Sequence, residues 1–283
     1  MRLMIDDPYI YDILPMQKGQ NPYINITFDA AHNKTMIATQ YHRVLAAFHK
    51  ILLGPLPPHH VHLPDIVFVA NGGLSLPRLG RPLVVLPNMK YPQRQAELLS
   101  LREMFRILGI PTVDYPGREP FEGQAELKWF HGGRKCIGGY GHRATRAAFD
   151  ELAAFFREVY GEDAPDMLVV KLVSPNFYHL DVAMFEHDDS KCMVHRGAFS
   201  AANIKKIEQF LGAENVCVID TEDHFCLNAV VDGDRVITHH MTDPAIKPLM
   251  EERTGRTVYQ CATTEFEKSG GSVRCMTFDL YLT

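Results

Sequence analysis

Near its C-terminal end the sequence reads Ser269-Gly270-Gly271-Ser272-Val273-Arg274-Cys275-Met276-Thr277, with a cysteine shortly after paired glycines. The cysteine stands at the entrance to a short apolar strand predicted from Met276 to Leu282. Paired glycines allow positive φ and a close approach of the backbone to a ligand. Because a cysteine attacks as the thiolate and nearby positive charge lowers its pKa, Arg274 beside Cys275 favours a reactive cysteine. The alternative is a buried structural cysteine, which unpaired cysteines often are.

Upstream of this stretch, apolar β-rich runs alternate with amphipathic helical stretches, which predicts an α/β or α+β class. Ser200 is suited to cap a helix that ends before Gly212. We expect strands at 65–70, 82–87, 135–139, 167–173, 177–185, 216–220, 224–230 and 235–239, and helices at about 34–53, 93–108, 143–160, 201–211 and after 244.

A polar residue of a type used in catalysis stands beside an apolar strand at five places: Asn71, Glu122, His179, Asn228 and Cys275. Their spacing of about 50 residues is in the range of radial repeat arrays. Two strands, a helix and a short strand accompany most of them, so each repeat is a ββαβ unit. Five such units, closed by joining the two ends of the chain, would form one domain over residues 1–283, an α/β propeller with five-fold pseudosymmetry. The five polar residues would then meet in a central pocket.

The composition disfavours several classes of protein. The chain is 46% hydrophobic and 22% charged with a formal net charge of −5, which disfavours a general nucleic-acid binder. No secretory signal or apolar run of membrane-spanning length is visible. Six cysteines without a CxxC pair predict reduced thiols and a cytoplasmic location. His59, His60 and His62 follow a Pro-rich stretch and predict a solvated loop, since no metal-ligand pattern surrounds them.

Several motifs, in the same order along the chain, resemble the guanidine-modifying enzymes of the pentein superfamily, above all the arginine dihydrolase domain. The superfamily also contains arginine deiminases, dimethylarginine dimethylaminohydrolases and amidinotransferases. The resemblance is carried by Phe68-Val69-Ala70-Asn71-Gly72-Gly73-Leu74, Phe121-Glu122-Gly123, Gly139-Tyr140-Gly141-His142-Arg143, Phe177-Tyr178-His179-Leu180-Asp181, and the segment from Thr264 to Thr277.

The resemblance implies a covalent mechanism at the carbon of a guanidinium group. Cys275 would be the nucleophile that forms an amidino-enzyme. His179 would protonate the departing amine and then activate water. Glu122 would bond both His179 and the substrate, and Asp181 would hold the guanidinium nitrogens. Guanidinium is planar, charged and donor-only, so carboxylates are its natural partners, and the bound cation would also favour the thiolate.

The resemblance also assigns Asn71, Asn21, Arg143 and Asn228 to substrate binding, with Arg143 on the substrate α-carboxylate. Deiminases and methylarginine hydrolases usually carry an acidic residue where this chain has Asn71. An amide offers a donor as well as an acceptor, so this position should tolerate a neutral ureido group and permit a second hydrolysis. This chain departs from the dihydrolase pattern Glu-Gly-x-Gly-Asp at residues 122–126, and from Asn-Pro-Trp-Met at residues 21–24.

Each of these residues also has a structural explanation. His179 and Asp181 would share one face of a strand, as a buried pair or as two metal ligands. Glu122 could be a turn residue, Arg143 a surface cation and Asn228 a strand-end residue.

The sequence therefore predicts a cysteine hydrolase of a guanidino C–N bond without cofactor or metal, acting on arginine by deimination or by dihydrolysis to ornithine, ammonia and carbon dioxide. The alternatives are a dimethylarginine dimethylaminohydrolase, an amidinotransferase and a non-enzymatic protein-binding propeller. The expected partner is a small guanidino substrate, not nucleic acid or membrane. The sequence leaves open whether the chain forms a homo-oligomer.

Overall fold

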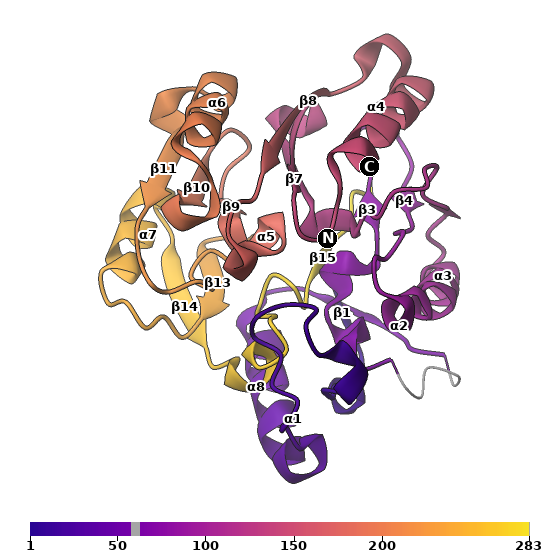
Figure 1. Cartoon of the computed structure of the whole chain (residues 1–283), viewed down its shortest axis with the longest axis vertical. Helices are drawn as coiled ribbons and strands as arrows, with labels where there is room; N and C mark the ends of the chain where they lie inside the picture. Colours follow the sequence, from indigo (N-terminus) through magenta and orange to yellow (C-terminus); the bar gives the residue numbers. More distant parts are fainter. Residues whose placement is uncertain (58–62, 283) are drawn as a thin grey trace.

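The computed structural model describes residues 1–57 and 63–282, whose strands form five sheets of three strands each. In every sheet the middle strand pairs antiparallel with one neighbour and parallel with the other. Figure 1 shows the sheets side by side with helices toward the outside. The fold is therefore α/β, and the five sheets are compatible with a pseudo-fivefold repeat.

The strand order is the same in four sheets along the chain. These are β3 (Leu74–Ser75), β4 (Val84–Val85) and β5 (Thr112–Val113); β6 (Leu127–Phe130), β7 (Lys135–Tyr140) and β8 (Asp166–Lys171); β9 (Met184–Glu186), β10 (Cys192–His195) and β11 (Val216–Ile219); and β12 (Val230–Asp232), β13 (Arg235–His239) and β14 (Thr257–Cys261).

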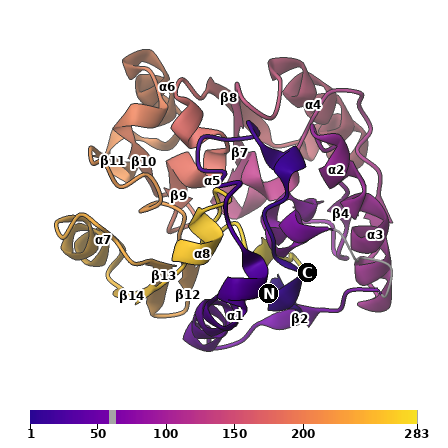
Figure 2. The ribbon, with the colours of Figure 1, turned by 60° about the horizontal axis from the view of Figure 1, so that its bottom comes forward.

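The fifth sheet joins the two ends of the chain. Its order is β15 (Phe278–Asp279), β1 (Arg2–Ile5) and β2 (Leu52–Gly54), with Leu3 opposite Phe278. Figure 2 shows the indigo start of the chain beside the yellow C-terminal segment. The segment that carries Cys275 leads directly into this closing sheet.

A helix always lies between the second and third strands of a sheet, because a parallel pair needs a crossover connection. The crossover helices are α1 (Ala30–Ala47), α2 (Pro92–Gln95) with α3 (Glu97–Ile107), α4 (Arg146–Tyr160), α6 (Ala201–Leu211) and α7 (Ile246–Thr254). The Ser200 side chain accepts from the Asn203 N–H at the start of α6, and Gly212 follows the helix with φ of 95°. The predicted caps of this helix are confirmed.

The core consists of apolar side chains packed between each sheet and its helix. In α4, Phe149, Leu152 and Phe156 recur three or four residues apart and are fully or almost fully buried, while the opposite face is exposed. This spacing is typical of an amphipathic helix on a sheet.

Three predicted elements differ from the structure. Residues 65–70 are not a strand but part of two 3-10 turns, Pro64–Val67 and Val69–Gly72. Their continuous apolar run is buried on all sides, and periodicity alone cannot assign such a run. The predicted strand around His179 and Asp181 contains a short helix, α5 (Leu180–Ala183). In the predicted strand 224–230, only residue 230 belongs to a strand, at the start of β12.

Boundaries differ at the N-terminal end as well. The helix expected from about residue 34 to 53 begins at Ala30, where the Asp29 side chain caps it, and ends at Ala47 before β2. The strands that were not predicted are β1, β2, β3, β5, β6, β10 and β14. His59, His60 and His62 lie outside the described residues. No helix within 1–57 and 63–282 combines the length and apolar character needed to cross a membrane.

Candidate active site

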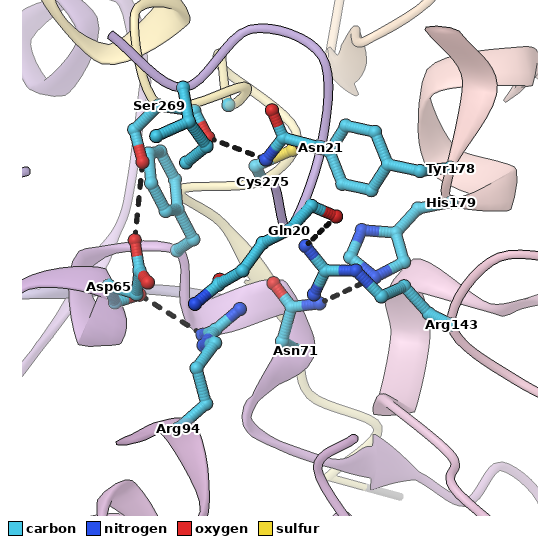
Figure 3. Close-up of a pocket in the computed structure, with 13 residues that line it drawn as sticks. Gln20, Asn21, Asp65, Asn71, Arg94, Arg143, Tyr178, His179, Ser269 and Cys275 are labelled. Atoms are coloured by element: carbon cyan, nitrogen blue, oxygen red, sulfur yellow. Dashed lines mark hydrogen bonds between the residues drawn. The ribbon is translucent and has the colours of Figure 1, made fainter. Parts of the chain in front are cut away.

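Residues from distant parts of the sequence line one partly open pocket, whose empty space with its opening to solvent is about 310 Å³. Figure 3 shows its polar lining, with Cys275, His179, Asn71 and Asn21 around the same space. The lining residues are Gln20, Asn21, Ile24, Asp65, Phe68, Asn71, Arg94, Arg143, Tyr178, His179, Ser269, Gly271 and Cys275. Of the eight predicted site residues, Asn21, Asn71, Arg143, His179 and Cys275 line this pocket, and Glu122, Asp181 and Asn228 support it from behind.

Cys275 stands on a compact turn that needs its glycines. Gly270 has φ of 97°, a conformation that favours glycine. A Cβ on Gly271 would come within 2.1 Å of the Phe68 ring, so this glycine is required by packing against the pocket wall and not by its φ.

Asn228 binds both the backbone and the sulfur of Cys275. Its side-chain oxygen accepts from the backbone N–H groups of Arg274 (2.9 Å) and Cys275 (3.3 Å), and its amide nitrogen lies 3.1 Å from the Cys275 sulfur. Asn228 is fully buried and does not line the pocket. Its side chain therefore positions the Cys275 backbone and sulfur from outside the pocket lining.

The expected help from Arg274 to the thiol is wrong. The Arg274 guanidinium turns away from the pocket to Thr277, Gln124 and Asp279. Burial raises the pKa of the Cys275 thiol well above its ordinary value, and the nearby Asp181 carboxyl adds to the shift. Adjacency in sequence does not place a cation beside the sulfur, so a positive charge that favours the thiolate would have to come from another group.

Glu122 is the centre of a buried hydrogen-bond network. Its Oε2 lies 2.9 Å from His179 Nε2, 3.0 Å from Arg143 Nη1 and 3.2 Å from Asn71 Nδ2, and its Oε1 accepts from the Lys90 N–H. Both carboxylate oxygens are therefore satisfied although the side chain is completely buried. The backbone after Glu122 packs closely against Gly73 because Gly123 has no Cβ. A Cβ at residue 123 would lie 2.2 Å from the Gly73 carbonyl oxygen.

These contacts set the protonation of both groups. Burial alone would raise the pKa of Glu122, but the charge of Arg143 and the hydrogen bond from His179 outweigh it and hold the pKa below its ordinary value. Burial lowers the pKa of His179, although Glu122 opposes that shift. A neutral imidazole that donates through Nε2 to a carboxylate keeps its lone pair on Nδ1. His179 can therefore accept a proton through Nδ1.

Two further buried carboxyl groups flank this network. Asp181 Oδ2 lies 3.6 Å from the Cys275 sulfur, and Glu126 Oε1 accepts from the Ala144 N–H and lies 3.7 Å from His179 Nε2. Burial is the largest factor that raises the pKa of each, and the neighbouring Glu122 adds to the shift at Glu126. Both are harder to ionise than an ordinary carboxyl group.

The pocket lining includes two residues that sequence reasoning missed. Arg94 and Asp65 line it: the Arg94 guanidinium donates to Glu97 at 2.7 and 2.9 Å and to the Asp65 carbonyl oxygen at 3.1 Å, and the Asp65 carboxylate accepts from Gln17 and Ser269. The available signal in the sequence for this ion pair was the spacing of three residues between Arg94 and Glu97 in the helix predicted at about 93–108.

Asn21 joins the N-terminal segment to the cysteine turn. Its amide donates to the Ser269 carbonyl oxygen at 3.0 Å, and its oxygen accepts from the Tyr23 N–H. Tyr178 donates to the Gly270 carbonyl oxygen on the same turn. Within residues 1–57 and 63–282, no group of three or more His, Cys, Asp or Glu side chains is arranged to hold a metal ion.

No family model matches the chain. An uncharacterized protein of Caenorhabditis elegans, ZK1307.1, is 29% identical over 219 residues, which cover 77% of this chain and 74% of that protein. The N(G),N(G)-dimethylarginine dimethylaminohydrolase of Mycobacterium tuberculosis is 28% identical over 77% of this chain and 67% of its own. The bifunctional arginine dihydrolase/ornithine cyclodeaminase ArgZ of Synechocystis is 28% identical over 76% of this chain, but the match spans only 29% of ArgZ.

Solved structures with a fold similar to this chain include the same kinds of protein. The N-terminal domain of ArgZ, an arginine dihydrolase from cyanobacteria, has a TM-score of 0.81 with 24% identity over 98% of this chain and 96% of that domain. A dimethylarginine dimethylaminohydrolase has a TM-score of 0.69 with 17% identity over 98% of both chains. In sequence and fold this chain is therefore similar to guanidine-modifying proteins of the pentein superfamily, near the arginine dihydrolase domain. The relatives with a named activity are an arginine dihydrolase and a dimethylarginine dimethylaminohydrolase, which supports an enzyme of that kind.

Proposed function

We propose that the protein is a cysteine hydrolase of free arginine that removes both terminal nitrogens of the guanidino group and yields ornithine, two molecules of ammonia and carbon dioxide. One observation carries the proposal: Cys275 and His179 line one pocket, Glu122 bonds His179, and Asp181 contacts the sulfur of Cys275. We extend it to a single domain over residues 1–283 with a five-fold propeller arrangement, which the repeated sheets and the closing pair of β1 and β15 support.

The charges of the pocket match an amino acid with a cationic end. Arg143 and Arg94 can bind an α-carboxylate, for which a guanidinium fork is suited, and Asp65 can accept from an α-amino group. Arg143 Nε is buried and makes no hydrogen bond with other parts of the described chain, so it has a donor to offer. The guanidino end of the substrate then reaches toward Cys275.

At that end the chemistry follows from the network. The guanidinium cation supplies the positive charge that the buried thiol lacks, and Cys275 attacks the guanidino carbon as the thiolate. Nδ1 of His179 takes up a proton and delivers it to the departing amine, so that ammonia leaves and an amidino-cysteine remains. Water, activated by the same nitrogen, then releases the cysteine and leaves a ureido group.

Asn71 supports the second hydrolysis. It donates to Glu122 at 3.2 Å, and its amide oxygen remains available to the pocket. At this position an aspartate would add a further negative charge beside Glu122 and favour the cation over the neutral ureido species. The related N-terminal domain of ArgZ has been crystallised with substrate and with product and is described as an arginine dihydrolase.

Hydrolysis of N-methylated arginine is the second candidate. Ile24 and Phe68 give one side of the pocket an apolar surface that could accept methyl groups, and the mycobacterial relative bears this activity in its name.

Products separate these functions. The protein is incubated with arginine, citrulline, methylarginines or agmatine, with and without an amine acceptor, and the products are identified by mass spectrometry. We expect ornithine from arginine and from citrulline. Citrulline that accumulates without further loss would reject the second hydrolysis, citrulline from methylarginine alone would favour the second candidate, and transfer to the amine would indicate an amidinotransferase.

A further inference from the structure

The carboxyl group of Asp181 has an unusual environment for an acid expected to hold a guanidinium group. It is completely buried, its Oδ1 has no hydrogen-bond partner among the described residues, and its Oδ2 contacts only the weak donor Cys275 Sγ at 3.6 Å. A buried carboxylate with so few donors is costly, whereas the protonated acid carries no net charge.

The neighbouring cations are already committed to other carboxylates. Lys128 lies 3.0 Å from Glu186, and Arg274 lies 3.1 Å from Asp279 and 3.6 Å from Glu186. They oppose the effect of burial on the pKa of Asp181 only in part.

The segments packed against α5 include β6 with Lys128, β9 with Glu186, and the 3-10 turn Gly123–Ala125 that follows Glu122. The other groups whose charge interacts with Asp181 are His179, Arg274, Cys275, Tyr178 and Glu126. A buried acid without a full counter-charge therefore lies behind the pocket lining, directly beside Cys275.

Resting on the function proposed above, we propose that Asp181 exchanges its proton for the substrate cation. In the free enzyme Asp181 is a neutral acid; arginine binding expels its proton to solvent and pairs the carboxylate with the guanidinium. When the first ammonia has left and a neutral ureido group occupies the pocket, Asp181 takes a proton back from solvent and donates it in a hydrogen bond to the ureido oxygen. One residue thus recognises both species of a two-step hydrolysis, as a carboxylate for the cation and as a donor for the neutral intermediate.

The exchange is measured as proton release on binding. Titration calorimetry in buffers of different ionisation enthalpy, between about pH 5 and pH 8, gives the number of protons released. The Cys275→Ala variant is used because it has no thiol proton to contribute to that number. We expect arginine to release up to about one proton, with a release that declines once the pH exceeds the pKa of Asp181 in the free enzyme. Citrulline should release none.

Matched substitutions locate the proton. In the Cys275→Ala background, Asp181→Asn should abolish the proton release and weaken arginine binding by about tenfold or more. The affinity for citrulline should stay within about threefold, because the amide is a permanent neutral donor. Adding Glu126→Gln instead, at the other buried acid, should leave the release intact.

The outcomes are distinct. Failure of the Cys275→Ala variant to bind arginine or citrulline would count against the proposed function itself. Arginine binding without proton release at any pH, or a release that survives Asp181→Asn and disappears with Glu126→Gln, would overturn the exchange at Asp181 while leaving the proposed function standing.

Discussion

Glu122→Gln tests the network most directly, because it removes one charge and changes no more than one heavy atom. The carboxylate holds the buried Arg143 at 3.0 Å and His179 at 2.9 Å, and both side chains are at most 4% exposed. A glutamine can keep its oxygen toward both donors only by turning its NH2 group toward the Lys90 N–H, and in either orientation the buried Arg143 cation loses its counter-charge.

The size of the effect follows from that geometry. Removing one partner of a buried ion pair costs about 3–5 kcal/mol, so we expect the free energy of unfolding to fall by about 3 kcal/mol. His179 loses the carboxylate charge that raises its pKa, so the pKa falls and the acidic limb of the activity profile moves to lower pH. Loss of general acid–base catalysis predicts a decrease in kcat/KM of about 10²- to 10⁴-fold.

Urea unfolding and initial rates of ammonia release from arginine measure the two effects. Glu126→Gln is the matched control: the same chemical change four residues later, at a carboxyl without an arginine partner, should alter the free energy of unfolding by less than about 1 kcal/mol. If Glu122→Gln does not fold, the double variant with Arg143→Gln should recover folding, because both charges are then absent. A kcat/KM of Glu122→Gln within about threefold of the wild type would refute the reasoning.

Three further predictions concern other parts of the site and its support. Cys275→Ala should abolish turnover and the amidino adduct seen by intact-protein mass spectrometry, and turnover near the wild-type rate would end its assignment as nucleophile. Asn71→Asp should stop the reaction after one hydrolysis, so that chromatography finds citrulline in place of ornithine; an unchanged ornithine yield would contradict the proposed role of the amide. His239, held between Asp223 at 2.9 Å and Glu267 at 3.4 Å, has its pKa raised to about 9 by these carboxylates against the effect of burial. Because a raised histidine pKa stabilises the fold at low pH and the effect is lost as pH rises through that value, His239→Gln should cost on the order of 3 kcal/mol near pH 6 and little above about pH 10; a pH-independent loss in thermal unfolding would exclude this linkage.

Local sequence predicted much of the regular structure. The Ser200 cap, the helix 201–211 and the strand at Arg235–His239 follow from capping chemistry and short-range apolar patterns, which depend on neighbours in the chain. The same reasoning failed at residues 65–70 and around His179, where segments buried on all sides carry no periodicity to distinguish a strand from a helical turn.

For the site, the sequence by itself determined which reactive side chains are available and in what order they follow. It could not determine which of them are charged. Three features depend on contacts between residues 46 to 150 positions apart or on burial. Arg274 points away from the sulfur, Asn228 binds the Cys275 segment, and Glu122 has charged partners while Asp181 lacks a full counter-charge. Protonation is set by distance and solvent exclusion, and only the tertiary structure specifies these quantities.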